Sequence, residues 1–165
     1  MALQVPSPTV FAISGRLSEN MEVKGNKVLK AQVHEVWLGL NDPQILAKCT
    51  PGCELLDPIN ESQFRTVIKV GVAAVSGTFQ GIVTISDVKP DESYNISVEA
   101  SSTLGFTRIS GVVTIAQEGL QTKLSYAFDA TIGGLIAGVG QRILGGVARR
   151  LVEQFFTSFE KELAR

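Results

Sequence analysis

Apolar and polar residues alternate with a period of two through the middle of the chain. This alternation is typical of β-strands that have one apolar and one polar face. Turn sequences such as Lys89-Pro90-Asp91-Glu92 and Glu118-Gly119 separate the runs, so successive strands are expected to be antiparallel neighbours. Each predicted strand then has an apolar face that needs a cover. The predicted strands are residues 64–72, 75–86, 94–101, 106–117 and 120–132.

The residues before this region predict one more strand and two short helices. Glu22–Ala31 alternates loosely and is predicted to be the first strand, whereas Val33–Leu40 has its apolar residues at helical spacing. Asp42 is a suitable cap for a second helix and Pro43 suits its first position. Thr50-Pro51-Gly52 is expected to end that helix.

The end of the chain has the pattern of one long amphipathic helix. No proline occurs between Gly134 and Ala164, and about 31 helical residues would span roughly 46 Å, enough to cross a twisted sheet. A spacing of four residues exceeds the roughly 3.6 residues of a helical turn, so an apolar row with this spacing winds around the helix. Gly145-Gly146 is the expected place for a bend. We expect an α+β fold in which a curved antiparallel sheet wraps around this helix. The apolar row is Leu135, Val139, Ile143, Val147, Leu151, Phe155, Phe159 and Leu163, and beside it lies a second row of Ile136, Leu144, Ala148, Val152 and Phe156.

Composition narrows the class of protein. The chain has 165 residues, of which 44% are apolar and 19% charged, and its net charge of −1 lacks the basic excess of a nucleic-acid binder. No apolar run approaches the roughly 20 residues of a membrane span. Residues 1–20 lack both the pattern of a signal peptide and a sustained period, so we assign them to an N-terminal extension and residues 21–165 to a single domain. We expect a soluble, cytoplasmic protein.

The residues with reactive side chains are few. Cys49 and Cys53 form a C-x-x-x-C pair around Thr50-Pro51-Gly52, and His34 is the one histidine. A structural turn is the favoured interpretation, ahead of a redox or disulfide pair and of a metal site, because zinc needs four ligands. His34 is expected to face solvent, and no nucleophile with an orienting group accompanies it. We therefore expect neither a catalytic site nor a metal site.

Glycines concentrate near the end of the chain, where each costs up to about 1 kcal/mol relative to alanine inside a helix. They indicate either close backbone packing against the sheet, or a surface of small residues that leaves volume for a ligand or lets the helix move as a lid. They are not a dinucleotide-binding fingerprint, because they do not follow the first strand of a βαβ unit. The glycines are Gly133, Gly134, Gly138, Gly140, Gly145 and Gly146.

Several short motifs between Met21 and Leu163, taken in order, resemble the G-subunit family of carbon monoxide dehydrogenase, which is part of the helix-grip (START-like, SRPBCC) superfamily. The resemblance implies a curved antiparallel sheet of about six or seven strands wrapped around a long C-terminal helix, with two short helices after the first strand. The motifs are Val36-Trp37, Asn41-Asp42-Pro43, Cys49-Thr50-Pro51-Gly52-Cys53-Glu54, Val70-Gly71-Val72, Phe79-Gln80-Gly81, Gly133-Gly134, Gly140-Gln141-Arg142 and Phe155-Phe156.

The resemblance also implies a role. Proteins of this family resemble accessory factors of molybdenum-containing carbon monoxide dehydrogenases and related hydroxylases, which they help tether to the cytoplasmic membrane or connect to its quinone pool. We therefore expect a non-catalytic accessory protein with a peripheral place at the inner face of that membrane. It requires no cofactor, and a quinone or another lipid is its expected ligand. The alternatives are a docking or assembly factor with a filled core and, less favoured, a cyclase- or lyase-like enzyme, which the fold alone does not establish.

Helix-grip proteins often have an elongated apolar pocket between sheet and helix, and such a pocket is the expected ligand site. Tyr126 has a hydroxyl to offer a carbonyl-bearing ligand. Arg142, Arg149 and Arg150 lie near the polar side of the predicted helix, where they either are solvated, with Arg149 paired to Glu153, or bind a partner or a lipid headgroup. The expected lining is Trp37, Val70, Phe79, Val83, Ile96, Val98, Leu124, Tyr126, Phe128, Leu135, Val139 and Ile143.

Overall fold

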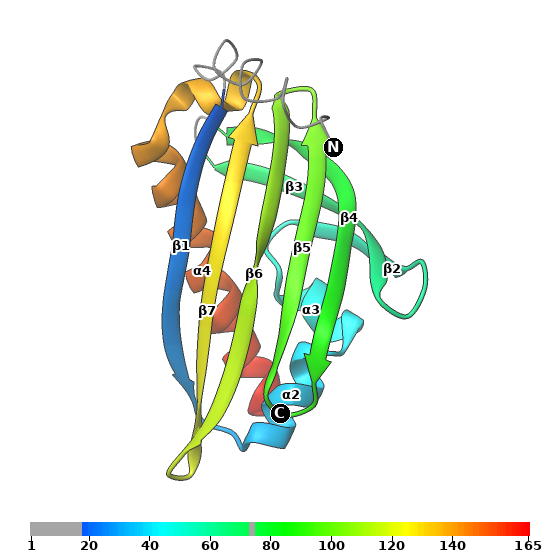
Figure 1. Cartoon of the computed structure of the whole chain (residues 1–165), viewed down its shortest axis with the longest axis vertical. Coiled ribbons are helices and arrows are strands. Elements are labelled where there is room, and N and C mark those ends of the chain that lie inside the picture. The colour runs from blue at the N-terminus through cyan, green and yellow to red at the C-terminus, as the bar shows by residue number, and fades with distance from the viewer. Residues whose placement is uncertain (1–17, 73–74) are drawn as a thin grey trace, which may run out of the picture.

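The computed structural model describes residues 18–72 and 75–165. In this part of the chain, a seven-stranded antiparallel sheet curves around the C-terminal helix, in the strand order β1-β7-β6-β5-β4-β3-β2 (Figure 1). Strands β2 to β7 therefore form a meander, and β1 joins its far edge beside β7. The predicted fold class is confirmed. The strands are β1 (Ser18–Leu29), β2 (Cys53–Pro58), β3 (Gln63–Val72), β4 (Val75–Lys89), β5 (Ser93–Ser102), β6 (Gly105–Glu118) and β7 (Gln121–Gly133).

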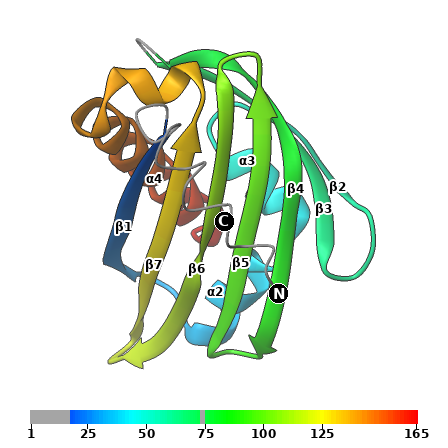
Figure 2. The same cartoon turned by 45° about the horizontal axis from the view of Figure 1, so that its top comes forward.

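Two short helices follow β1, and they lie on the same side of the sheet as the C-terminal helix (Figure 2). Helix α2 (Val33–Leu40) begins where the backbone N–H of Gln32 donates to Glu35 Oε1 at 3.0 Å. Helix α3 (Pro43–Cys49) begins where Asp42 Oδ1 accepts from the backbone N–H of Gln44 at 2.9 Å. The predicted cap at Asp42 is confirmed, because a side-chain acceptor satisfies an N–H group that has no partner within the helix.

The first strand begins earlier than the sequence predicts. Ser18 pairs with Gly133 and Asn20 with Thr131, so three residues assigned to the N-terminal extension belong to the sheet. β1 is an edge strand with a solvated face. Its backbone pairing with the end of β7 extends it toward the N-terminus, ahead of the first apolar residue of the predicted strand. The remainder of the predicted extension, residues 1–17, lies outside the described residues.

The C-terminal segment is not one continuous helix. A 3₁₀ helix, η3 (Leu135–Val139), precedes α4 (Gln141–Leu163), and the two are separated by Gly140. The long helix is confirmed, but its start and the position of the break differ from the prediction, which placed a bend at Gly145-Gly146. Gly140 has φ 92° and ψ 158°, a conformation that is essentially restricted to glycine and that cannot continue a helix.

The core has two parts. The first lies where α2, α3 and the end of α4 meet the sheet, and it is rich in aromatic residues: the Trp37 and Tyr94 rings meet edge to face at 5.7 Å, and Phe155 stacks on Phe159 at 5.4 Å. The second lies under η3 and the start of α4. This smaller cluster comprises Val75, Phe79, Ile132, Ile136 and Leu144.

Candidate functional site

An apolar cavity of about 390 Å³ lies between the sheet and α4. Its volume falls within the roughly 300–1,000 Å³ of typical small-molecule sites. Carbon atoms form nearly all of its wall, and the polar side chains in its described lining are Thr66 and Thr107. Thr66 Oγ1 already donates to the carbonyl of Leu55 at 3.1 Å. The cavity is therefore suited to a hydrocarbon chain or ring rather than to a charged group.

Small residues on the helix leave this volume open. Ala148 lines the cavity between Leu144 and Leu151, and Gly145 and Gly146 precede it. A Cβ atom added to Gly145 would meet Arg149 Nη1 at 3.4 Å and no other described atom closer than 4 Å. Gly145 and Gly146 are therefore not packed closely against the sheet, but neither of them belongs to the described cavity wall, so the cavity interpretation stays a prediction for them.

Gly133 and Gly134 agree with the interpretation of close backbone packing. A Cβ atom on Gly133 would lie 2.3 Å from the Phe106 ring, and one on Gly134 would lie 2.6 Å from Gly105 Cα. The end of β7 is thus packed too closely for a side chain. The glycine-rich sequence accordingly serves close packing before η3.

The strands supply the predicted part of the lining. The cavity wall includes Val70, Phe79, Ile96, Val98 and Phe128, all five of which the sequence pattern selects. Cross-strand register explains why they meet, since Val98 lies opposite Ile109 on β6, and Ala130 lies opposite both Ile109 and Met21. Sequence reasoning missed further wall residues that share faces with the predicted ones, namely Met21, Val23, Ile68, Val75, Ile109 and Ala130.

Other predicted lining residues lie elsewhere. Trp37 and Leu124 are 8% and 2% exposed and are part of the filled core at the end of the sheet near α2. Val139 packs against the smaller cluster, and Val83 is half-buried and outside the described cavity wall. Tyr126 packs against the aromatic core and faces a neighbouring groove.

The predictions for Leu135 and Ile143 are wrong. Their side chains are 74% and 45% exposed, so neither lines the cavity. Leu135 lies in η3, before the break at Gly140, and the winding of the apolar row around α4 turns Ile143 outward. Both rows contribute to the wall: Ile136, Leu144, Ala148 and Val152 come from the second row, and Val147 and Leu151 come from the first.

Two grooves border the cavity on opposite sides of α4. The groove between β1 and α4 has a volume of about 530 Å³ and shares Met21, Val23 and Val152 with the cavity wall. The groove between α4 and β3 has a volume of about 400 Å³ and shares Val70 and Leu151 with that wall. Each groove is therefore directly adjacent to the apolar cavity.

The predicted arginines do not form one patch. Arg149 lines the groove beside β1, whereas Arg150 lines the groove beside β3, and Arg142 is exposed at the start of α4. Within residues 18–72 and 75–165, Arg149 forms no ion pair with Glu153, although the two are one helical turn apart. Binding of a partner by these arginines stays a prediction.

Tyr126 lies where the aromatic core, the cavity and the β1 groove come together. Its ring stacks on Phe128 at 5.8 Å and lies 5.9 Å from the Phe156 ring. Burial, and secondarily the Glu153 carboxylate, raises the pKa of the Tyr126 phenol. The hydroxyl therefore stays protonated and available as a hydrogen-bond donor at neutral pH.

The two cysteines belong to a turn. Both are free thiols, and Cys49 is buried. Gly52 between them has φ 76°, and a side chain there would also collide with the carbonyl of Lys69, so both observations require glycine. Burial raises the pKa of the Cys49 thiol, and Glu162 raises it further, whereas Lys48 lowers it. A neutral thiol is a poor nucleophile and metal ligand, so the structural interpretation is favoured.

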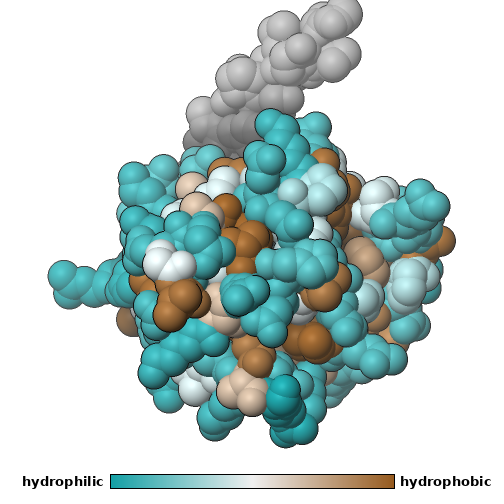
Figure 3. Space-filling model, turned by 90° about the horizontal axis from the view of Figure 1, so that it is seen from below, coloured by the Kyte–Doolittle hydropathy of each residue, from teal (hydrophilic) through white to brown (hydrophobic). Residues whose placement is uncertain are grey.

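The end of the molecule that carries α2 and the β6–β7 turn has no broad apolar face in the view of Figure 3. Its hydrophobic patches are small and are separated by hydrophilic side chains. The exposed apolar residues of α2, the end of β4 and the β6–β7 turn are Leu38, Val88 and Leu120. Singly exposed residues of this kind are normal on protein surfaces.

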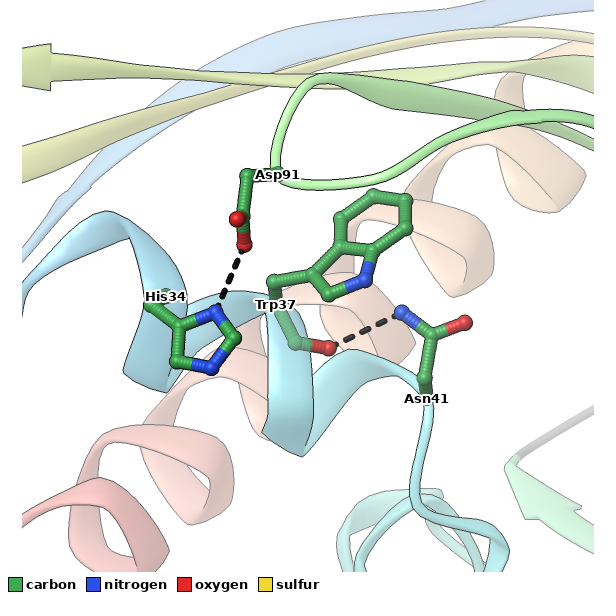
Figure 4. Close-up of polar contacts among 4 residues, drawn as sticks. All are labelled: His34, Trp37, Asn41 and Asp91. Carbon is green, nitrogen blue, oxygen red and sulfur yellow. Dashed lines mark hydrogen bonds and ion pairs between the residues drawn. The ribbon is translucent and has the colours of Figure 1, made fainter.

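His34 is exposed, as the sequence predicts, and links α2 to the β4–β5 turn (Figure 4). Its Nδ1 lies 3.0 Å from Asp91 Oδ1, with 67% and 44% of the two side chains exposed. Nearby, Asn41 Nδ2 donates to the carbonyl of Trp37 at 2.9 Å. These contacts hold surface elements together, and in the described structure they involve no serine or cysteine nucleophile.

Comparison with known proteins identifies the family. Residues 25–164 match the family model CoxG, which describes the G subunit of carbon monoxide dehydrogenase. The chain belongs to the CoxG family. No protein with a curated description matches it. In the described part of this CoxG family member, none of the helices combines the length and apolarity of a membrane span.

Solved structures agree with the helix-grip fold of this CoxG family member. A conserved protein from Geobacillus kaustophilus is 38% identical, with a TM-score of 0.85 over 87% of this chain and 95% of that one. The Zhui aromatase/cyclase from a Streptomyces species is 15% identical, with a TM-score of 0.67 over 89% and 95% of the two chains. Ara h 8.0201 is 9% identical, with a TM-score of 0.64 over 88% and 99%. The last two likenesses concern the fold alone.

Proposed function

We propose that this protein is a non-catalytic carrier that holds a lipid-like molecule between the sheet and α4. The observation that supports this function is the cavity of about 390 Å³, whose wall consists almost wholly of apolar side chains. Membership of the CoxG family, named after an enzyme complex, supports an accessory role.

The apolar wall provides the driving force for binding. Burial of about ten methylene groups at about 0.8 kcal/mol each removes about 8 kcal/mol of unfavourable contact with water. In a bilayer, the surrounding lipids shield an acyl or isoprenoid tail from water, and the cavity wall provides the same shielding. A molecule that normally resides in the membrane is thus able to leave it without exposing its tail.

We propose further that the ligand is a quinone and that the protein serves a molybdenum hydroxylase of the carbon monoxide dehydrogenase type. A neutral ring with an apolar tail suits a cavity without charged groups better than a fatty acid does. Because a quinone resides in the bilayer, the carrier meets it through peripheral contact at the inner face of the cytoplasmic membrane. The family name supports the identity of the partner enzyme.

The alternative functions have less support. A docking factor with a filled core disagrees with the open volume beneath α4. An enzyme of the cyclase or lyase type needs positioned acid and base groups, and the described cavity wall holds no titratable side chain. The likeness to an aromatase/cyclase, at 15% identity, concerns the fold and gives this alternative no further support.

The decisive experiment is to identify what the protein carries. We expect organic extraction of purified protein, followed by mass spectrometry, to recover a quinone or another lipid, and stripped protein to take up added menaquinone from vesicles. Protein that yields no lipid and takes up no quinone would contradict the carrier function. If a purified molybdenum hydroxylase gains no activity toward membrane quinone when loaded protein is added, the proposed partner is wrong.

A further inference from the structure

The groove between β1 and α4 differs chemically from the cavity beside it. The two share Met21, Val23 and Val152, so the cavity and the groove adjoin and these side chains belong to both walls. Whereas the cavity wall is almost free of polar atoms, the groove is lined by polar and charged groups from both elements. An apolar compartment thus adjoins a polar one, which is the arrangement that an amphipathic molecule requires.

The edge of β1 contributes backbone groups to this groove. Gln141, at the start of α4, donates from Nε2 to the carbonyl of Asn20, so that carbonyl points away from β7 and toward the helix. Since successive residues of a strand alternate in direction, the peptide groups of Glu22 and Lys24 point to the same edge. Both residues line the groove, and no described residue outside the sheet bonds to their peptide groups.

Tyr126 and Arg149 contribute the side-chain donors. The Tyr126 ring stacks on Phe128, which lines the cavity, so the phenol extends the cavity wall into the groove. Its hydroxyl lies 2.7 Å from the place that a Cβ atom on Gly25 would take, and only a glycine leaves room for it. On the other wall, the Arg149 guanidinium folds back over Gly145.

The charges of the groove balance. Lys24 and Glu22 are paired at 3.5 Å, which leaves Arg149 and Glu153 as a cation and an anion without described ion-pair partners. A carboxylate or phosphate headgroup that pairs with Arg149 would also face Glu153, and a cationic one that pairs with Glu153 would also face Arg149. A neutral group with oxygen acceptors meets neither repulsion, and it finds donors in Tyr126, Arg149 and the edge of β1.

We propose that the β1–α4 groove binds the neutral, oxygen-bearing headgroup of an amphipathic ligand whose tail lies in the cavity. Tyr126 and Arg149 are the side chains that select this headgroup, through hydrogen bonds to its carbonyl or hydroxyl oxygens. The inference rests on the proposed carrier function and adds the class of headgroup, its position and the side of α4 on which it lies.

The test compares three probes with alkyl chains of nine or ten carbons: decane, decanoate and decylbenzoquinone. Dissociation constants are measured for the wild-type protein and for the variants Tyr126→Phe and Arg149→Gln. We expect the wild-type protein to prefer decylbenzoquinone, and each variant to lose about fivefold or more of this affinity, the value of one hydrogen bond, with decane binding unchanged. Tyr94→Phe, which removes a phenol from the filled core, and Lys161→Gln, which removes an exposed charge from α4, are the matched controls and should bind all probes as the wild type does.

Other results separate the headgroup site from the carrier function. If none of the probes binds wild-type protein, the carrier function itself fails. If the probes bind but Tyr126→Phe and Arg149→Gln leave the preference for decylbenzoquinone unchanged, the carrier function stands and the headgroup site is wrong. Preference for decanoate together with its loss in Arg150→Gln would place the headgroup in the groove on the opposite side of α4 and would overturn the inference.

Discussion

At the scale of single residues, two tyrosines on the same face of the sheet have different surroundings. Tyr94 is 6% exposed and contacts Trp37 in the filled core, and burial raises the pKa of Tyr94 to about 12. Tyr126 lies at the same register two strands across the sheet, where the core gives way to the β1 groove. One phenol therefore contributes to stability, and the other is placed to contact a ligand.

The buried phenol of Tyr94 predicts a loss of stability in alkali. An unfolded tyrosine ionises near pH 10, whereas folded Tyr94 has a pKa of about 12, so its contribution is complete below pH 10 and declines as the pH rises toward 12. We expect the free energy of unfolding to fall by about 2–3 kcal/mol more in the wild type than in Tyr94→Phe over this range. Urea titrations at several pH values measure the difference, and parallel curves for the two proteins would contradict the prediction.

At the scale of elements, the junction of η3 and α4 decides which residues face the ligand. The amide of Ile136 donates to the carbonyl of Leu104 at 2.8 Å, which fixes η3 on the β5–β6 turn. The backbone of Gly140 changes the direction of the chain, and α4 then begins at Gln141 and places Leu144 in the cavity wall. The orientation of α4 thus depends on one residue with an unusual backbone conformation.

This dependence predicts the effect of alanine at two neighbouring glycines. Gly140→Ala should lower the free energy of unfolding by about 1–3 kcal/mol, because a side chain is strained at φ 92° even though no described atom lies within 4 Å. Gly138→Ala has the same open surroundings without the positive φ, so it should be neutral or slightly stabilising. Denaturant unfolding of both variants tests the difference, and equal stabilities would show that the break imposes no strain.

At the scale of the whole molecule, the interior is filled at one end and hollow at the other. Aromatic rings from α2, the sheet and the end of α4 occupy the filled end, whereas the hollow part is lined mainly by aliphatic side chains, among them Ala100, Ala130 and Ala148. A small residue such as Ala148 therefore makes fewer packing contacts than a larger side chain would make at this position. We interpret the hollow as selected for a ligand rather than for stability.

Filling the hollow should separate stability from ligand capacity. Ala148→Leu introduces a larger side chain into the cavity, and we expect unfolding stability to be maintained or raised while uptake of menaquinone falls at least tenfold. Lys161→Leu makes a comparable change at an exposed position of the same helix and should leave uptake unchanged. Undiminished uptake by a folded Ala148→Leu protein would mean that the ligand binds outside the cavity.

The sequence by itself determined the features that depend on neighbouring residues. Alternation set the faces of the strands, so Ile96, Val98 and Phe128 were assigned correctly to the cavity side. The bounds of α2 and the cap of α3 followed from local spacing and from Asp42-Pro43. These predictions succeed because side-chain direction in a strand, and the satisfaction of N–H groups at a helix start, are settled within a few residues.

Only the tertiary structure decided which part of the interior is hollow. Trp37 and Leu124 have the same apolar character as Phe79, yet they pack into the filled core with α2 and the end of α4, whereas Phe79 packs with Ile136 and Leu144 and lines the cavity. The outward turn of Leu135 and Ile143, and the separation of Arg149 from Arg150, likewise depend on how α4 lies across the sheet. Packing volume and cross-strand register involve residues far apart in the chain, and periodicity along one segment does not contain them.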